Sequence, residues 1–360
     1  NFTKPGDYFE FTTDIVNEGT IDAMVDVVSN NAYQTAASTT PITLPTYLTS
    51  TVTYDDGVEI QPNQELLHNT SEKIKVRVEF KKDIEISDLP SSGDTSIVFK
   101  FIGDYKQADE NAKPVRVDFS TASWDDVIDA YENNPTSLEQ SMNNGVTKEV
   151  KMDIDNDGTD ETYHVRIANL SKCTTEGTGS SCGLVIEFAD VVALHRYNPY
   201  STDGTTIGDG NNGGWEHSEL REYISTTIYN ALPSDIKSII ISTTVVSGHG
   251  DRETTNFETS DKLFLLDARE VYGDNYDNSR YNTAHDLERQ LDYYRNKGVT
   301  DTSFEATKKA YKNTGDQTWW LRSAGSWFHH FFFFSQPQAG CGTKDSENPS
   351  VGVSPAFRIA

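Results

Sequence analysis

The sequence predicts a two-domain protein in which an N-terminal all-β sandwich is followed by an α+β domain. The chain has 360 residues, which exceeds a typical single domain. Its first part contains only short strand-like segments, whereas the rest mixes helical and strand-like patterns. A short polar connection at residues 109–117, which contains Pro114, separates the two patterns. The predicted domains are therefore residues 1–108 and 118–360.

Residues 1–108 form a series of predicted strands. The clearest, residues 73–80, alternates Lys, Arg and Glu with Ile, Val and Phe, as a half-buried strand does. Asp56-Gly57 is a typical turn dipeptide. Strands of this length and spacing predict a β-sandwich. The domain contains no cysteine and one histidine, His68, so its sequence offers no clustered catalytic set.

The second domain begins with two predicted helices. Ser123 can cap the first, and Ser137 with Gln140 forms a capping-box pattern for the second. A third helix is predicted to open at Trp215 and to end before Pro233, with Leu220, Ile224, Ile228 and Leu232 on its core face. Strands are predicted at 148–152, 162–167, 184–188, 239–241, 244–246 and 262–266, with a long Gly-, Asn- and Asp-rich loop at 198–214.

The composition is strongly acidic, since 30 Lys and Arg against 56 Asp and Glu give a net charge of −26. Such a chain repels phosphate backbones, so nucleic-acid binding is not expected. No run of about twenty apolar residues is present, so no membrane span is predicted. Asn1 does not open a signal peptide, and a signal or anchor is expected N-terminal to this chain.

Three cysteines are too few for a disulfide scaffold. Cys173 and Cys182 flank a short polar loop, TTEGTGSS. They form a local disulfide if the protein resides in an oxidising compartment, and stay free otherwise. Cys341 would remain unpaired.

An acidic loop lies between the predicted strands 148–152 and 162–167. Its D-x-D-x-D-G spacing matches the first half of a calcium loop, in which carboxylate oxygens surround the ion. The second half does not match, because position twelve is His164 rather than glutamate. The alternative is a plain hairpin that turns at Asp157-Gly158. The candidate calcium ligands are Asp153, Asp155, Asp157 and Asp160, and no other cofactor is expected.

The sequence does not predict an enzyme. Ser247 and His249 lie in a glycine-flanked segment, but no nucleophile elbow or orienting carboxylate accompanies them. Adjacent His329 and His330 alternate faces on a strand and cannot easily share a metal. Metalloprotease, paired-cysteine and phosphate-loop motifs do not occur.

The C-terminal stretch, residues 318–360, contains the aromatic run WFHHFFFF at 327–334. A strand that is buried on both faces would bury all of these aromatic side chains. Gly325, Gly340 and the polar segment 343–350 favour instead an exposed apolar patch, which usually marks a binding site.

The motifs that enclose this run carry a resemblance. WWLRSA at 319–324 and GVSPAFRI at 352–359 resemble the C-terminal motifs of C-type-lectin-fold variable proteins diversified by retroelements, as found in gut Firmicute surface proteins. In that family the end motifs are scaffold and the segment between them is the variable, ligand-binding surface. The resemblance therefore implies a C-type-lectin-like domain of the formylglycine-generating-enzyme-like branch, with a variable segment at 325–350.

The ligand-binding residues that the resemblance implies come from this segment. Mutation of template adenines accounts for its Phe, His, Cys, Thr, Asp, Asn and Ser members, but not for Trp327, Gln336, Gln338, Lys344 or Glu347. Arg322 and Arg358 lie in the fixed motifs and are expected to make buried structural pairs. The implied ligand-binding residues are Gly325, Trp327, Phe328, His329, His330, Phe331, Phe333, Gln336, Gln338, Cys341, Thr343, Lys344, Asp345, Asn348 and Ser350.

The N-terminal domain carries a second resemblance. The stretches PGDYFEFTTDIVNEGTIDA and TYDDGVEI…EKIKVRVEFKKD resemble the Ig-like domains of Gram-positive surface and biofilm-matrix proteins. This implies an Ig-like sandwich with a spacing or assembly role.

Together these features predict an extracellular or surface-displayed bacterial adhesin or receptor that binds a protein on another cell or a phage through residues 325–350. The first alternative is a pilus or matrix assembly protein with the aromatic run in a subunit interface. The second is an enzyme of the formylglycine-type fold, which would require Cys341 or a metal site.

Overall fold

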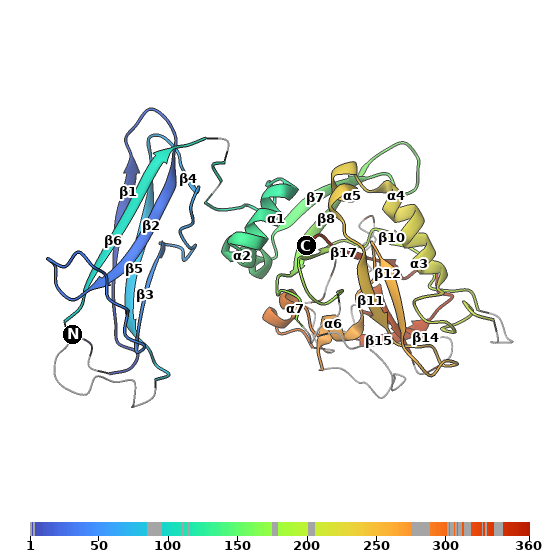
Figure 1. Ribbon diagram of the computed structural model, residues 1–360. Helices are drawn as coiled ribbons and strands as arrows, with labels where there is room; N and C mark the ends of the chain where they lie inside the picture. The colour runs from blue at the N-terminus through green and yellow to red at the C-terminus, as the bar shows by residue number, and fades with distance from the viewer. Residues whose placement is uncertain are drawn as a thin grey trace. The chain divides into compact units, whose positions relative to one another are not determined.

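The computed structural model describes residues 2–360 apart from 3, 85–95, 110, 114, 175–178, 201–205, 275–288, most of 301–317, 326, 328, 329 and 335–340. Within 301–317 it describes 302, 306, 308 and 312, and of 332–334 and 341–344 it describes the backbone. The chain divides into two compact units, residues 1–117 and 118–360 (Figure 1). The predicted connection, 109–117, is the end of the first unit.

The first unit is all-β in its described part and contains two three-stranded antiparallel sheets with strand orders β1-β5-β3 and β4-β2-β6. Val25 from one sheet and Ile74 from the other are fully buried in a common core. The predicted alternation at 73–80 is confirmed, since Ile74, Val76 and Val78 are buried in β5. The strands are β1 (Tyr8–Asn17), β2 (Ala23–Tyr33), β3 (Leu48–Tyr54), β4 (Glu65–Leu66), β5 (Thr70–Phe80) and β6 (Val98–Gln107).

The second unit mixes helices and strands. Its helical elements are α1 (Trp124–Asn133), α2 (Thr136–Asn144), α3 (Glu219–Tyr223), a π-helical turn (Ile224–Ile228), α4 (Tyr229–Ala231), α5 (Ser234–Ile239), α6 (Ala268–Tyr272) and α7 (Asp292–Asn296). Its strands are β7 (Thr147–Met152), β8 (Glu161–Asn169), β9 (Val185–Phe188), β10 (Ala193–Leu194), β11 (Thr243–Ser247), β12 (Phe257–Asp261), β13 (Trp319–Ala324), β14 (His330–Phe334), β15 (Cys341–Asp345), β16 (Gly352–Val353) and β17 (Ala356–Arg358).

The C-terminal strands join both larger sheets of the second unit. One sheet has the order β17-β9-β8-β7, and the other has the order β10-β16-β13-β14-β15. The strands β11 and β12 form a separate hairpin. The last residues of the chain are therefore integral to the fold, because β16 and β17 pair with strands that precede them by more than a hundred residues.

Two predicted helix starts are wrong, and one is confirmed. The Ser123 side chain accepts from the Asp126 N–H at the start of α1, as expected. Pro135 rather than Ser137 is the N-cap of α2, and Ser137 is buried. The third helix begins at Glu219, where Ser218 caps it, rather than at Trp215. Trp215 is fully buried in the preceding turn, where its indole N–H donates to Asp261 at 2.9 Å.

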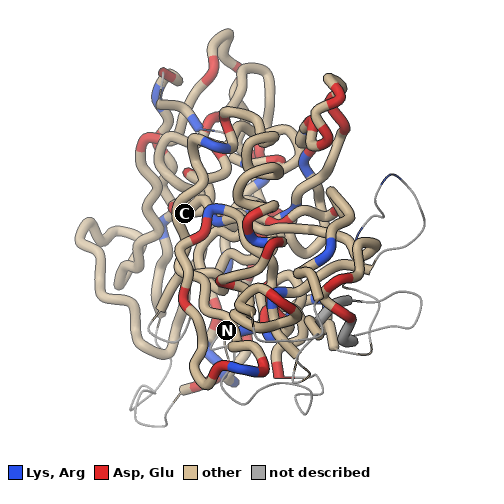
Figure 2. The backbone as a smooth tube through the Cα atoms, turned by 90° about the vertical axis from the view of Figure 1, so that its right-hand side faces the viewer, with Lys and Arg blue, Asp and Glu red and all other residues tan. Residues whose placement is uncertain are grey.

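Cys173 and Cys182 form a disulfide, which resolves the alternative that the sequence left open. None of the described helices is both long and apolar enough to span a bilayer. Asp and Glu are spread along the chain (Figure 2) rather than collected in one tail.

Candidate ligand-binding site

The frame of the candidate site is the buried strand β13. Every residue from Trp319 to Ala324 is buried, and the Trp320 indole N–H donates to the His195 carbonyl at 2.8 Å. The strand pairs with β14 on one side and with β16 on the other. The WWLRSA motif therefore lies inside the domain, whereas Trp327 in the segment that follows it lies at the surface.

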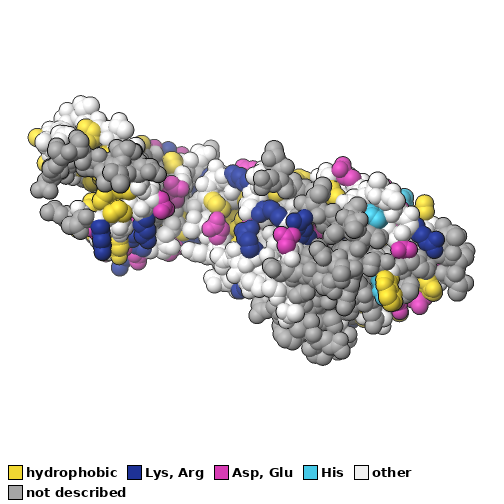
Figure 3. Space-filling model, turned by 90° about the horizontal axis from the view of Figure 1, so that it is seen from below, with side chains coloured by type: hydrophobic (Ala, Val, Ile, Leu, Met, Phe, Trp, Pro, Cys, Tyr) yellow, Lys and Arg dark blue, Asp and Glu magenta, His cyan; other side chains and the backbone are white. Residues whose placement is uncertain are grey.

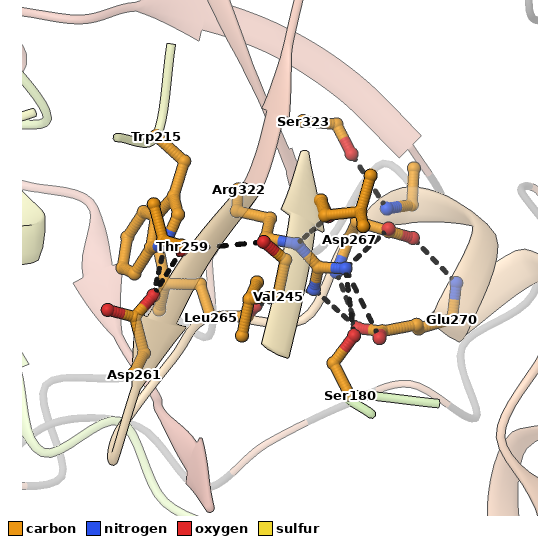
Figure 4. A network of polar contacts seen from close by, with 12 residues as sticks. Ser180, Trp215, Val245, Thr259, Asp261, Leu265, Asp267, Glu270, Arg322 and Ser323 are labelled. Atoms are coloured by element: carbon orange, nitrogen blue, oxygen red, sulfur yellow. Dashed lines mark hydrogen bonds and ion pairs between the residues drawn. The ribbon is translucent and has the colours of Figure 1, made fainter. Parts of the chain in front are cut away.

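Arg322 anchors this frame from within the core. Its guanidinium is fully buried and contacts Asp267 at 2.8 Å and Glu270 at 2.6 Å (Figure 4). It also donates to the carbonyls of Val246 at 3.0 Å and Leu265 at 2.8 Å. The expectation of a buried structural pair is therefore confirmed for Arg322. Arg358 is half-buried, and its described hydrogen bonds go to the carbonyls of Ala360 and Gly179.

The Arg322 cluster holds two carboxylates against one guanidinium, so it carries a negative excess in a buried place. Burial raises the pKa of Glu270 to about 7, and the neighbouring Asp267 charge adds to this, while Arg322 opposes it. The cluster is buried away from solvent and links α6 to β13. Its geometry suits structural support rather than contact with a ligand.

The chain turns sharply from β13 into β14. The Gly325 N–H donates to the His330 carbonyl, and the His330 N–H donates to the Trp327 carbonyl, both at 2.8 Å. Gly325 is buried within this turn. Trp327 lies at the outside of the turn and is 64% exposed.

Three side chains of the predicted segment meet at the surface. The Trp327 ring stacks on the His330 ring, with centroids 5.4 Å apart and planes 15° apart. His330 Nε2 lies 3.0 Å from Asp345 Oδ1, so β14 and β15 are joined by this pair. Asp345 is exposed, and the imidazole is largely covered. An exposed aromatic ring, a histidine and a carboxylate therefore share one surface.

The prediction that Phe331 lies on the ligand-binding surface is wrong. It is fully buried, and its ring stacks on Tyr197 with centroids 3.4 Å apart. Sequence reasoning placed it in the exposed patch because a run of consecutive aromatics does not show which residues face inward. Gly325 is also buried, so a ligand can reach neither residue in this structure.

The other predicted residues are placed as follows. Asn348 is half-buried, and its side chain accepts from the Ser350 N–H at 2.9 Å in the turn after β15, where Ser350 is exposed. The backbones of Phe333, Cys341, Thr343 and Lys344 belong to β14 and β15. Phe328, His329, Gln336 and Gln338 lie outside the described residues.

Asn211 is a supporting residue that sequence reasoning missed. Its side-chain amide donates to the carbonyls of Gly325 at 2.7 Å, Trp327 at 2.8 Å and His330 at 3.2 Å. Its side-chain oxygen accepts from the Asp251 N–H at 3.1 Å. A Cβ at Gly250 would collide with the Asn211 carbonyl, so glycine is required there. The Asn-Gly composition of residues 210–214 indicated only a loop.

The glycine-flanked histidine has a backbone partner rather than Ser247 among its described hydrogen bonds. His249 is buried, and its Nδ1 lies 2.7 Å from the carbonyl of the adjacent Gly250. Ser247 Oγ is buried without a hydrogen-bond partner among the described residues.

The acidic loop connects β7 to β8. Oxygens of Asp153, Asp155 and Asp157 lie within 4.8 Å of one another, whereas Asp160 is not part of this group. Both Asp153 oxygens accept backbone N–H bonds, from Asp157 at 3.1 Å and Gly158 at 2.9 Å. Lys312 Nζ lies 3.1 Å from Asp155. The loop therefore closes the β7–β8 hairpin and also brings three of the four candidate calcium ligands together.

His164, at the twelfth position of the calcium pattern, has another partner. Its ring Nδ1 lies 2.8 Å from the Asp190 carboxylate, and its backbone N–H donates to the same carboxylate. The histidine therefore cannot complete a calcium site while these contacts persist.

Comparison with known protein families gives a match for the C-terminal part of the chain. Residues 192–360 match the family described as domain of unknown function DUF6273. The matched stretch contains the Arg322 cluster, Asn211 and the segment 325–350. No curated protein and no solved structure matches the chain.

Proposed function

We propose that this protein is a non-enzymatic, surface-displayed binding protein whose ligand-binding surface is the segment 325–350. The observation that carries the proposal is the exposed Trp327–His330–Asp345 surface next to the buried strand β13. A rigid aromatic side chain offers a large contact area at a low cost in conformational entropy, as in antibody paratopes. Polar neighbours supply adaptable hydrogen bonds.

The division between frame and surface supports a diversified segment. The residues of the two end motifs are buried or half-buried, whereas Trp327, Asp345 and Ser350 between them are exposed. Substitution at exposed positions leaves a packed core intact, so such a segment tolerates variation. We therefore propose that a retroelement diversifies this surface, and that the second unit is a C-type-lectin-like domain and the first an Ig-like domain.

The disulfide and the charge agree with this proposal. A disulfide such as Cys173–Cys182 persists in oxidising environments, which include the cell surface. A net charge of −26 disfavours nucleic acid as a ligand. The partner that we propose is a protein on another cell or on a phage, because exposed aromatic side chains such as Trp327 are enriched in protein contact surfaces.

The test is to sequence the codons for residues 325–350 across sibling isolates and to search the neighbouring DNA for a near-copy. We expect differences confined to codons with template adenines, with 319–324 and 352–359 unchanged. An invariant segment without a neighbouring near-copy would contradict diversification.

A second test measures tolerance in the protein itself. We expect Trp327→Ser to shift the thermal midpoint by less than about 2 °C, because the ring is exposed. Arg322→Met, in contrast, leaves Asp267 and Glu270 buried without their cation and should cost about 3–5 kcal/mol. Equal destabilisation by the two substitutions would show that Trp327 belongs to the frame rather than to a free surface.

The assembly alternative predicts a different behaviour of the same variant. If the segment lies in a subunit interface, Trp327→Ser abolishes concentration-dependent oligomerisation. Leu67→Ala, at an exposed residue of the first unit, is the control. If the segment binds another protein, both variants keep the oligomeric state of the unmodified chain.

A further inference from the structure

The strand β1 is an edge strand of the first unit. It pairs with β5 along its whole length, from Tyr8 to Asn17, and is the outermost strand of its sheet. No described residue pairs with its other side. Every residue from Tyr8 to Asp14 is exposed. Such an edge presents a row of backbone donors and acceptors to any strand that approaches it.

The same strand exposes aromatic side chains on the core face of the sheet. Phe9 is 60% exposed and Phe11 is 46% exposed, and their rings lie 6.1 Å apart. Their partners across the ladder, Val78 and Val76, are buried, and Ile15 on the same face of β1 packs against the core. The two phenylalanines therefore extend the apolar face past the part that the second sheet covers. Hydrophobic side chains gather on this unit in Figure 3.

The edge also lacks the features that keep natural edge strands apart. Residues 8–17 contain no Lys, Pro or Gly, and their register with β5 has no bulge. The Glu10 carboxylate is paired with Arg77 at 3.1 Å. The edge strand of the other sheet, β6, differs because it contains Lys100, Gly103 and Lys106 and has a register shift opposite it. The other edge of the same sheet, β3, also lacks Lys, Pro and Gly, but Thr53 bridges to Glu59 and only two residues of β3 are exposed. The strand β1 is therefore the more exposed edge of its sheet.

We propose that β1 pairs antiparallel with β1 of a second copy of this chain, centred on Phe11. This register uses the whole exposed run, and it places Phe11 opposite Phe11 and Phe9 opposite Thr13. It also places Glu10 opposite Thr12 and Tyr8 opposite Asp14, so no like charges are opposed.

The neighbouring symmetric registers fit less well. Centring on Thr12 places Glu10 opposite Asp14, which is repulsive. Centring on Thr13 recruits Ile15 and Asn17, which are half-buried. The Phe11 register joins the two three-stranded sheets into one continuous sheet and covers the exposed phenylalanines of both copies. The surface belongs to the first unit, so this pairing is independent of the proposed function of residues 325–350.

The first test is sedimentation equilibrium of the whole chain over micromolar concentrations. We expect a dimer whose dissociation constant rises roughly tenfold or more in Phe11→Lys, because a lysine blocks an edge and replaces the central aromatic contact. Ile102→Lys on β6 is the matched control, since Ile102 is 45% exposed against 46% for Phe11. It should change the dissociation constant less than about twofold, and both variants should keep the thermal midpoint.

Two results would overturn the proposal. One is a chain that stays monomeric throughout, which would leave β1 free or reserve it for a different protein. The other is a dimer that Phe11→Lys leaves unchanged or that Ile102→Lys dissociates, which would place the interface elsewhere.

Disulfide trapping tests the register in a Cys341→Ser background. Opposed residues of antiparallel strands have Cα atoms about 4.5–5.5 Å apart, which a disulfide spans. Phe11→Cys should therefore cross-link to itself. A mixture of Phe9→Cys and Thr13→Cys chains should cross-link to each other, and Phe9→Cys alone should not. Self-linking of Phe9→Cys, or failure of the mixed pair, would refute this register and the proposal with it.

Discussion

Asn211 joins the loop of residues 206–217 to the turn that carries Trp327. One side-chain amide donates to three carbonyls of that turn, and its oxygen accepts from Asp251. The position of Trp327 thus depends on a residue more than a hundred positions earlier in the chain. No sequence pattern of a Gly- and Asn-rich loop indicates which asparagine makes such contacts.

We expect Asn211→Ala to lower the free energy of unfolding by about 2–3 kcal/mol, because several buried polar groups lose their partner. Asn212→Ala is the matched control, since the described side-chain bond of Asn212 is a single one to the Thr206 carbonyl. It should cost about 1 kcal/mol. Urea unfolding of the two variants measures the difference, and equal losses would contradict the special role of Asn211.

Glu270 predicts a pH dependence of stability. Burial raises its pKa to about 7 from an ordinary 4.5, so the folded state holds a proton that the unfolded state releases in this interval. The stabilisation that protonated Glu270 contributes is complete below pH 4.5 and is lost as the pH rises through 7. The free energy of unfolding should fall by up to about 1.4 kcal/mol per pH unit within that window.

The Glu270→Gln variant isolates this effect, because glutamine stays neutral throughout. Denaturant unfolding of both proteins between pH 5 and pH 8 should show a difference in stability that shrinks or reverses as the pH rises. Parallel curves for the two proteins would mean that Glu270 titrates at its ordinary pKa.

Phe331 shows the limit of prediction at this scale. The run at 327–334 is compatible with an exposed patch and with a buried strand, and the sequence offers no criterion to divide it. The structure places Trp327 outside and Phe331 inside, because Tyr197 from another segment supplies a stacking surface for the latter. The tertiary neighbour decides which aromatic is available.

At the scale of elements, the β7–β8 hairpin combines turn and acidic cluster. The turn was a predicted alternative to a calcium loop, and the described contacts are compatible with both. Asp153 accepts two backbone N–H bonds, and Lys312 neutralises Asp155. These contacts hold the loop while the three carboxylates stay close together.

We therefore expect calcium to bind this loop weakly, in the millimolar range, because the pattern lacks its twelfth-position glutamate and a lysine lies at the cluster. Titration calorimetry measures the affinity. Lys312→Ala should tighten binding, and Asp155→Asn should abolish it. Micromolar affinity in the unmodified chain, lost in Asp155→Asn, would contradict this expectation of weak binding.

The helices illustrate how local signals compete. Ser123 caps α1 as its position predicts, whereas Ser137 is buried and Pro135 takes the cap of α2. Trp215 was predicted to begin a helix. Its ring is instead buried, its indole N–H donates to Asp261, and the helix begins at Glu219 after the cap residue Ser218. Where a large side chain finds a buried site, packing overrides the local pattern.

At the scale of the whole molecule, the two units have separate cores. The Cys173–Cys182 disulfide lies in the second unit and closes a short loop, with a sequence separation of 9. A loop of this length stabilises a fold by about 2–3 kcal/mol in the chain-entropy model. Its loss should therefore affect one unit only.

Calorimetry of a Cys173→Ser/Cys182→Ser variant tests this expectation. The transition of residues 118–360 should fall by roughly 5–10 °C, and that of residues 1–117 should not move. A single transition that shifts as a whole would show that the units unfold together.

The sequence by itself determined the broad architecture of this protein. Strand periodicity at 73–80 and the mixed patterns after residue 117 predicted an all-β part followed by a helix-and-strand part, because these periods depend on local burial alone. It also predicted that Arg322 is buried and paired, through the resemblance of the WWLRSA motif to a family's scaffold motif. The tertiary structure decided the rest: the Cys173–Cys182 bridge, the burial of Phe331, the role of Asn211 and the edge position of β1. Each of these depends on which distant segments of the chain come into contact, and the local pattern of the sequence does not show such contacts.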